Sequence, residues 1–393
     1  MNTPRRAVPA GTLTVLRILI AILAGALAVV LGALFALVRT VARRVVVPAN
    51  RENDTRIVRL DLKAQTITLQ STPDTRLPGR YGLFTTGTVD YIKLGTILAQ
   101  DEQTVTRKLL TEVDGAMRLG RDAAFSGWYF DAPDQLQLPY QPELIGTAAG
   151  PAPAWIFPGG DTWVIQVHGR VTRRAECLRA VPVFHDAGMT SLIVSYRNDG
   201  EAPRSRSGMY ALGETEWRDV DAAIGYAKRH GAARVILMGW SMGGAIVLQA
   251  VTRSAHRELI AGIVLESPVI DWRSVLTYQA QENRIPASLG NLAVSSLQGG
   301  WSARAMGAGD PIPFDRLDMV AGAGRLQVPV LILASDDDGF VPSDGAHALA
   351  AARPDIVQLD VFSVARHTKL WNYDQSRWDG DIRSWLAEQG FTG

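Results

Sequence analysis

The pattern of hydrophobic and polar positions first marks off the N-terminal part of the chain. From Ile18 to Val38 every residue is apolar or glycine. As a helix this run rises about 32 Å, which matches the hydrocarbon core of a bilayer. It is longer than the apolar region of most signal peptides and has no polar face. We therefore predict a tail and transmembrane helix in residues 1–45, with the span at 18–38; a cleaved signal peptide and a buried core helix are the alternatives.

Residues 46–150 alternate between apolar and polar positions in the manner of strands. The alternation is clearest in Val58–Lys63 and Thr66–Gln70, and turn sequences such as T-P-D and L-P-G-R separate these runs. Residues 101–119 fit either a strand pair or a short helix. The composition of residues 146–153, G-T-A-A-G-P-A-P, is typical of a linker. We predict a small β-rich module that ends in this linker.

From residue 151 to residue 393, short apolar runs alternate with amphipathic ones. The apolar runs are typical of buried parallel strands, as in T-W-V-I-Q-V, R-V-I-L-M and V-P-V-L-I-L-A-S. Between them lie helical stretches such as Glu214–His230. The β-α-β order predicts an α/β fold with a mostly parallel, doubly wound sheet.

Charge and cysteine content narrow the possible functions. The chain has 40 basic and 39 acidic residues and a net charge of +1, so no global field favours nucleic acid or another polyanion. Its single cysteine, Cys177, has no partner for an internal disulfide or a cysteine metal cluster, and we interpret it as a small buried hydrophobic residue. Arginines flank the apolar run of the predicted single-pass membrane protein, and the richer C-terminal flank favours a cytoplasmic location for the domain that follows. Translocation of that domain is the alternative, because a long domain can cross the membrane despite its flanking charge.

The strongest chemical signal is the sequence G-W-S-M-G-G at residues 239–244. A G-x-S-x-G pattern alone is weak, but here it follows the apolar strand R-V-I-L-M and precedes the helical run A-I-V-L-Q-A-V. A serine at such a turn adopts a strained backbone, and only small residues at Gly239 and Gly243 allow close approach of strand and helix. The context predicts Ser241 as a nucleophile; a glycine-rich helix start that only packs or binds an anion is the alternative.

A nucleophilic serine needs a base, and the base needs an acceptor that fixes its tautomer. After the strand V-P-V-L-I-L-A-S comes D-D-D-G-F-V-P, which offers Asp336, Asp337 and Asp338 as the acid, with Glu266 as a further candidate. The family resemblance described below selects Asp338. His367 follows the strand Q-L-D-V-F-S-V, where a loop at the sheet edge can bring the imidazole to the serine. His347 lies on a predicted helix that leads away from the acid loop, and we interpret it as structural.

Together, V-H-G-R, G-W-S-M-G-G, D-G-F-V-P and R-H-T resemble the α/β-hydrolase superfamily, especially its membrane-tethered BEM46-like and abhydrolase-domain serine hydrolases. The resemblance covers residues 151–393 and leaves 46–150 unassigned. It implies the chain order nucleophile, acid, histidine, without a metal or organic cofactor. The backbone N–H groups of Met242 and Arg170 are the implied oxyanion donors, with His168 shaping the loop. Because Arg170 departs from the family pattern, we also consider a contact of its side chain with an acidic substrate group.

The resemblance also implies a short cap at about residues 271–327. Its apolar residues either line an acyl pocket or pack against the domain: Trp272, Tyr278, Ile285, Leu289, Leu292, Trp301 and Met306. The expected function is a membrane-anchored serine hydrolase that cleaves a small or lipid-like carboxylic ester through an acyl-enzyme. An aminopeptidase, amidase or thioesterase is the enzymatic alternative, and a non-catalytic scaffold with the same fold is the alternative from another class.

Overall fold

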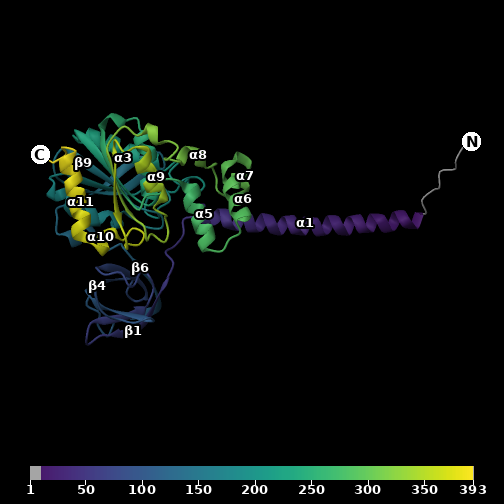
Figure 1. The fold of residues 1–393 in the computed structure, drawn as a ribbon, viewed down its shortest axis with the longest axis horizontal. Coiled ribbons are helices and arrows are strands. Elements are labelled where there is room, and N and C mark those ends of the chain that lie inside the picture. The colour runs from purple at the N-terminus through teal and green to yellow at the C-terminus, as the bar shows by residue number, and fades with distance from the viewer. Residues whose placement is uncertain (1–9, 393) are drawn as a thin grey trace, which may run out of the picture.

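The computed structural model describes residues 10–392, with side chains from residue 14 onward. In chain order it contains a long helix, a six-stranded closed barrel and an eight-stranded sheet covered by helices. The helix projects away from the folded part, and the barrel lies against one end of the α/β region (Figure 1). The predicted architecture, a β-rich module followed by an α/β domain, is confirmed.

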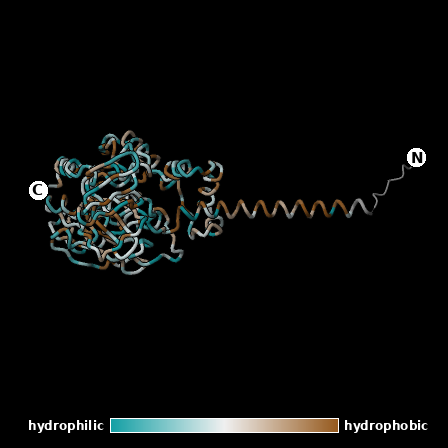
Figure 2. The backbone as a smooth tube through the Cα atoms, turned by 90° about the horizontal axis from the view of Figure 1, so that it is seen from below, coloured by the Kyte–Doolittle hydropathy of each residue, from teal (hydrophilic) through white to brown (hydrophobic). Residues whose placement is uncertain are grey.

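Helix α1 (Ala10–Val46) contains the predicted span. It is the one helix among the described residues that is long and apolar enough to cross a membrane. Its apolar side chains are exposed as far as Leu37, which gives a continuous hydrophobic rod (Figure 2). Val38, Ala42 and Val46 then recur every four residues and are buried, so the last turns present one face to the folded part.

The strands of the barrel are all antiparallel and run in the order β1-β2-β5-β4-β3-β6. Alternate residues such as Ile67 and Leu69 fill its interior. Of the two alternatives for residues 101–119, the structure contains a strand, β5. The strands are β1 (Thr55–Asp61), β2 (Thr66–Gln70), β3 (Tyr81–Gly87), β4 (Tyr91–Gln100), β5 (Thr104–Leu109) and β6 (Leu119–Ser126).

A buried arginine organises one loop of this barrel. Arg107 on β5 is fully buried and donates hydrogen bonds to the carbonyl oxygens of Thr75, Leu77, Gly79 and Gly95. Burial lowers the pKa of Arg107 to about 10, which leaves the guanidinium charged at neutral pH. The loop between β2 and β3 therefore takes its shape from a cation inside the barrel.

The second sheet has the strand order β14-β13-β12-β11-β9-β10-β8-β7. Its pairs from β10 to β14 are parallel, whereas β8 pairs antiparallel with both β10 and β7. The strands are β7 (Gln141–Thr147), β8 (Gly150–Phe157), β9 (Thr162–Val167), β10 (Thr190–Val194), β11 (Arg234–Trp240), β12 (Ile260–Glu266), β13 (Val330–Ser335) and β14 (Val357–Phe362).

The prediction of a linker at residues 146–153 is wrong. These residues form the turn and the adjoining strand ends of the β7–β8 hairpin, in which Thr147 pairs with Gly150. Composition misled here because glycine, proline and alanine are also tolerated at a tight turn and on strands near a sheet edge. The sheet therefore begins at Gln141, before the linker that the composition predicts.

Both faces of the parallel strands are buried, which explains their continuous apolar runs. Ile165 and Leu237 point into a core with α3 and α4, whereas their neighbours Val164 and Ile236 point into a core with α2 and α11. The covering helices are α2 (Val181–Asp186), α3 (Trp217–Arg229), α4 (Met242–Arg253), α9 (Asp344–Ala352), α10 (Leu370–Tyr373) and α11 (Gln375–Glu388).

The cap follows β12 and consists of short helices, as the resemblance implies. Helix α5 begins at Trp272 behind an Asp271 N-cap, whose carboxylate accepts from the backbone N–H groups of Arg273 and Ser274. Helices α6 and α7 pack on the C-terminal part of α1, beside which they lie in Figure 1. The cap helices are α5 (Trp272–Glu282), α6 (Ala287–Gln298), α7 (Gly300–Met306) and α8 (Phe314–Leu317).

We expect Arg107→Met to lower the free energy of unfolding by about 2–4 kcal/mol, because it leaves buried carbonyl oxygens without donors. Arg59→Met is the matched control, since the Arg59 side chain on the same barrel is 73% exposed. Chemical denaturation of the full chain in detergent measures both variants. Equal unfolding midpoints for the two would contradict a structural role of the buried cation.

Candidate active site

Ser241 occupies a sharp turn between β11 and α4, with backbone φ of 52° and ψ of −118°. A positive φ is unusual for serine and is strained. The neighbouring glycines allow it: a Cβ on Gly243 would lie 2.1 Å from the Val167 carbonyl oxygen, and one on Gly239 would lie 2.5 Å from that of Gly243. Ser241 is consequently held at the carboxyl edge of the sheet, as the sequence predicts.

The structure brings Ser241, His367 and Asp338 into one hydrogen-bonded chain. Ser241 Oγ lies 2.9 Å from His367 Nε2, and His367 Nδ1 lies 2.7 Å from Asp338 Oδ2. The three residues follow β11, β14 and β13 respectively, all at the same edge of the sheet. The arrangement has the nucleophile, base and orienting-acid geometry of a serine hydrolase.

Asp338 is held in its ionised form. Burial alone would raise its pKa, but the charge and hydrogen bond of His367, with the N–H groups of Val341 and Phe340, outweigh burial and lower the pKa below its ordinary value. Those two N–H groups lie 2.9 and 2.8 Å from Asp338 Oδ1. One carboxylate oxygen is therefore fixed by the backbone, and the other is left for the imidazole.

The competing residues are engaged elsewhere. Asp336 contacts His347, 3.0 Å from its Nε2, and Asp337 pairs with Arg366. Glu266 is buried and accepts hydrogen bonds from two indole N–H groups, those of Trp240 and Trp378. Burial raises the pKa of Glu266, so this carboxyl group is a structural partner of the tryptophans.

The two implied oxyanion donors lie near the serine. Met242 begins α4, so its N–H has no acceptor within its own helix. The loop after β9 passes close to the serine, since a Cβ on Gly169 would lie 3.3 Å from Ser241 Cβ. Arg170 is the next residue along this loop.

The idea that the Arg170 side chain contacts an acidic substrate group does not agree with the structure. Its guanidinium Nη2 lies 2.7 Å from the carbonyl oxygen of Arg44 and 3.0 Å from that of Val47. The Arg44 carbonyl belongs to the last turn of α1, where helix carbonyl groups lack intrahelical donors, and Val47 directly follows the helix. The side chain caps α1 and is not free to bind substrate.

A buried histidine–aspartate pair supports the same loop. His168 Nε2 lies 3.1 Å from Asp199 Oδ2, and its ring stacks on Tyr196 with centroids 4.3 Å apart. The Tyr196 hydroxyl donates to the carbonyl oxygen of Gly169. His168 therefore shapes the loop, as expected, but sequence reasoning missed Asp199; its position shortly after the buried strand β10, at the same sheet edge, was the available signal.

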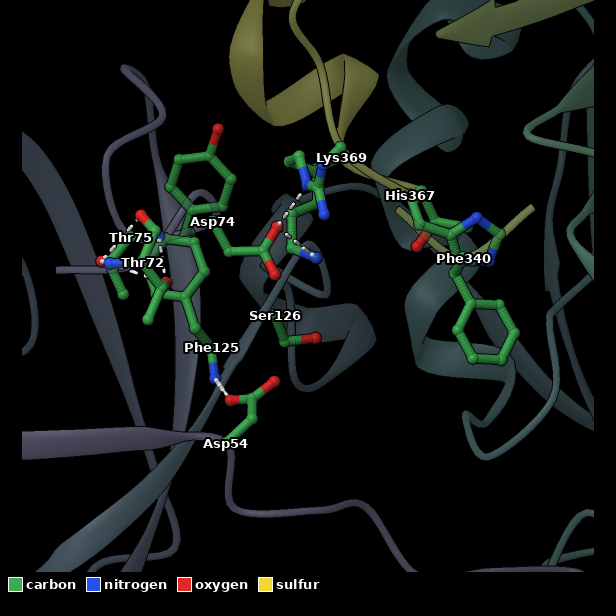
Figure 3. Close-up of polar contacts among 12 residues, drawn as sticks. Asp54, Thr72, Asp74, Thr75, Phe125, Ser126, Phe340, His367 and Lys369 are labelled. Carbon is green, nitrogen blue, oxygen red and sulfur yellow. Dashed lines mark hydrogen bonds and ion pairs between the residues drawn. The ribbon is translucent and has the colours of Figure 1, made fainter. Parts of the chain in front are cut away.

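The barrel grips the loop that carries His367. Asp74, between β2 and β3, lies 3.4 Å from Arg366 Nε and 3.5 Å from Lys369 Nζ, and these two residues flank the histidine. Figure 3 shows Asp74 reaching toward Lys369, with His367 farther along the same loop. Arg366 also donates to the carbonyl oxygen of Asp337. One arginine thus joins the barrel, the histidine loop and the acid loop.

Backbone contacts extend this grip. Asn372 Nδ2 donates to the carbonyl oxygen of Arg80 in the barrel, and Asn372 Oδ1 accepts from Arg179. Arg179 also donates to the carbonyl oxygen of Thr368, which directly follows the histidine and has φ of 52°. The sequence predicted a β-rich module but did not reveal its role, and it gave no sign of this clamp.

The seven apolar cap residues differ in burial, and Tyr278, Ile285 and Leu289 are half-buried. Trp272 and Met306 are buried, and the Trp272 indole donates to the carbonyl oxygen of Leu212. Leu292 and Trp301 are exposed, so they line no enclosed acyl pocket. Beside the site, the Phe340 ring lies 5.1 Å from the His367 ring (Figure 3).

Among the described residues, no three His, Cys, Asp or Glu side chains come together as metal ligands.

Two segments of the chain match known families. Residues 161–303 match the family described as "Serine aminopeptidase, S33". Residues 56–126, which include the barrel strands, match a family described as a domain of unknown function, DUF8805. No curated protein sequence matches significantly. These matches agree with the superfamily that the motifs resemble, and they do not confirm its BEM46-like branch.

Solved structures are similar to large parts of the chain. An esterase from Pyrococcus furiosus, Pf2001, is 16% identical with a TM-score of 0.52, over 65% of this chain and 95% of the esterase. A puromycin-hydrolysing peptidase from Mycobacterium tuberculosis is 21% identical with a TM-score of 0.46, over 84% of this chain and 45% of the peptidase. The esterase shows the fold, and the family match over residues 161–303 identifies this part of the chain as an α/β-hydrolase superfamily domain.

Proposed function

We propose that this protein is a membrane-anchored serine hydrolase that cleaves a carboxylic ester through an acyl-enzyme on Ser241. The observation that carries the proposal is the hydrogen-bonded chain from Ser241 through His367 to Asp338, with heavy-atom distances of 2.9 and 2.7 Å. Distances in this range are those of a base within reach of a hydroxyl proton. The strained turn at Ser241 further supports a functional role.

In the first half-reaction, His367 Nε2 takes the proton from Ser241 Oγ as the oxygen attacks the ester carbonyl carbon. The carbonyl oxygen becomes an oxyanion, which the N–H groups of Met242 and Arg170 stabilise. Asp338 keeps the imidazole in the correct tautomer and stabilises the imidazolium. The tetrahedral intermediate then expels the alcohol, which leaves with the proton from His367, and the acyl group remains on Ser241.

In the second half-reaction, His367 deprotonates a water molecule that attacks the acyl-enzyme carbonyl. The resulting intermediate collapses, Ser241 recovers its proton from the imidazolium, and the carboxylic acid leaves. The same groups therefore act twice, and the bond broken in the second step is the one formed in the first. Apart from the ester and the attacking water, these steps use the side chains and backbone groups already described.

The anchor in this proposal is α1, because its apolar residues stay exposed over the length of a bilayer core. The arginines that follow the span favour a catalytic domain on the cytoplasmic side. An amidase or peptidase is the second candidate, because the family matched by residues 161–303 is described as a serine aminopeptidase.

Ser241→Ala should abolish turnover of p-nitrophenyl esters, with a loss of about 10³-fold or more, because no nucleophile remains. It should also abolish covalent labelling by a fluorophosphonate, read by mass spectrometry of the intact chain. Ser384→Ala, at an exposed position on α11, is the control that keeps both. A wild-type chain that acquires no adduct would refute the proposal and favour a non-catalytic scaffold. Parallel assays with thioesters and amides separate the esterase from its alternatives.

Asp338→Asn should reduce kcat by about 10²–10⁴-fold, because an amide does not fix the required histidine tautomer.

The same substitution should also change the pH dependence of the free energy of unfolding. Since the pKa of Asp338 is lowered in the folded state, its stabilising contribution is present above its ordinary pKa and disappears as pH falls through the folded value. The difference in unfolding midpoint between wild type and variant should therefore be constant above about pH 5 and shrink below about pH 4. A difference independent of pH down to acid unfolding would contradict this pairing.

Asp74→Asn tests the clamp on the histidine loop. Loss of the ion pairs with Arg366 and Lys369 should lower kcat by about 3–10-fold with little change in KM or unfolding midpoint, because partly exposed pairs add little stability. Asp74→Glu should restore part of the rate. Asp122→Asn, at an exposed position on barrel strand β6, is the matched control. Identical kcat values for the Asp74 and Asp122 variants would mean that the clamp does not position the base.

A further inference from the structure

One side of cap helix α6 has no charged residues although it is exposed. Ser288, Asn291, Leu292 and Ser295 recur every three or four positions and all are exposed. In the sequence, no charged residue occurs between Arg284 and Arg304. The solvent side of a surface helix normally carries charged residues. We call these four residues, together with Trp301, the cap face.

Trp301 is the most prominent member of the cap face. It stands in the first turn of α7, directly after α6, and is 81% exposed, more than any other large hydrophobic side chain in the described part of the chain. At this exposure, most of the large apolar surface of the Trp301 side chain packs against no other part of the fold. Tryptophan is enriched where proteins meet the membrane–water interface.

The level at which the cap helices pack on α1 indicates how far the cap face lies from the proposed membrane span. The uncharged run ends at Val38, and Val38 is also the first buried residue of α1. The cap helices α6 and α7 pack against α1 and lie beside its C-terminal part (Figure 1). A bilayer core that ends near Val38 leaves the headgroup layer at the height of these helices.

Basic residues surround the same region. The side chains of Arg39 and Arg43 lie next to Gly307, at the end of α7. Arg284 and Arg304 flank the uncharged segment and are exposed. An uncharged apolar patch edged by arginines matches a lipid surface, where apolar groups enter the interface and guanidinium groups meet lipid phosphates.

We propose that the cap face lies in the headgroup layer of the bilayer that α1 crosses, so that the cap rests on a phospholipid surface. This inference depends on the membrane anchoring in the proposed function and adds a second contact with the same membrane. The partner is a lipid bilayer and not a protein, because the transmembrane helix brings the bilayer to this side of the cap. The contact would hold the catalytic domain at a fixed height beside its anchor.

Site-specific labelling of the full chain in lipid nanodiscs tests this arrangement. The native Cys177 is buried, so a single introduced cysteine carries an environment-sensitive fluorophore. Ser295→Cys reports on the cap face, and Ser384→Cys on α11 is the matched exposed control. Leu23→Cys, within the span, reports independently on insertion of α1. Iodide measures access from water, and spin-labelled lipids measure contact with the bilayer.

The expected result is that iodide quenches the residue-295 label about twofold less than the residue-384 label, while spin-labelled lipid quenches it more. Trp301→Ser in the Ser295→Cys background should reduce that difference. Equal quenching at residues 295 and 384, with residue 23 shielded, would overturn the cap contact alone. Water access at residue 23 would overturn the anchor as well. Shielding of residue 295 that persists in detergent and rises with protein concentration would indicate a second copy and overturn the proposal. Ester turnover, measured in parallel, reports separately on the chemistry.

Discussion

The strained backbone of Ser241 is the constraint on which the site depends. The strained conformation of Ser241, with φ of 52°, persists because packing on both sheet faces fixes the strand before it and the helix after it. The carbonyl oxygen of Val167 and the backbone of the adjacent glycines leave no space for a Cβ, so strand and helix approach more closely than side chains permit. The position of the hydroxyl therefore depends on the close main-chain approach at these glycines as well as on the packing of the two sheet faces.

His367 has no such support from its own strand. Its loop is held from three directions: Asp338 on the acid loop, Arg179 beneath it, and the barrel through Asp74 and Arg366. The barrel loop is in turn shaped by the buried Arg107. A module with its own core thus helps to position the base of the proposed triad.

The sequence predicted those features that depend on local pattern and chain order. Ser241 and Asp338 each follow a buried apolar strand, and His367 follows the half-buried edge strand β14. Parallel strands bring their carboxyl ends to one edge. The β7–β8 hairpin was missed because its turn has the composition of a linker. Asp199 and the Asp74–Arg366 pair depend on contacts between distant segments, which neither periodicity nor motif spacing encodes. The exposure of Trp301 was likewise invisible, since an aromatic residue on a short helix has the same pattern whether it faces a core or not.

The cap that Arg170 forms on α1 has a consequence for how the chain can be divided. Val38, Ala42 and Val46 belong to the same hydrophobic core as α3 and α4, and the Val46 carbonyl oxygen accepts from the N–H of Tyr210. A fragment that starts at residue 47 would lack the Arg44 carbonyl that accepts from the Arg170 guanidinium. It would also expose the apolar residues that pack against Val38, Ala42 and Val46. The last turns of α1 are thus an integral wall of the folded domain, and a soluble fragment has to keep them.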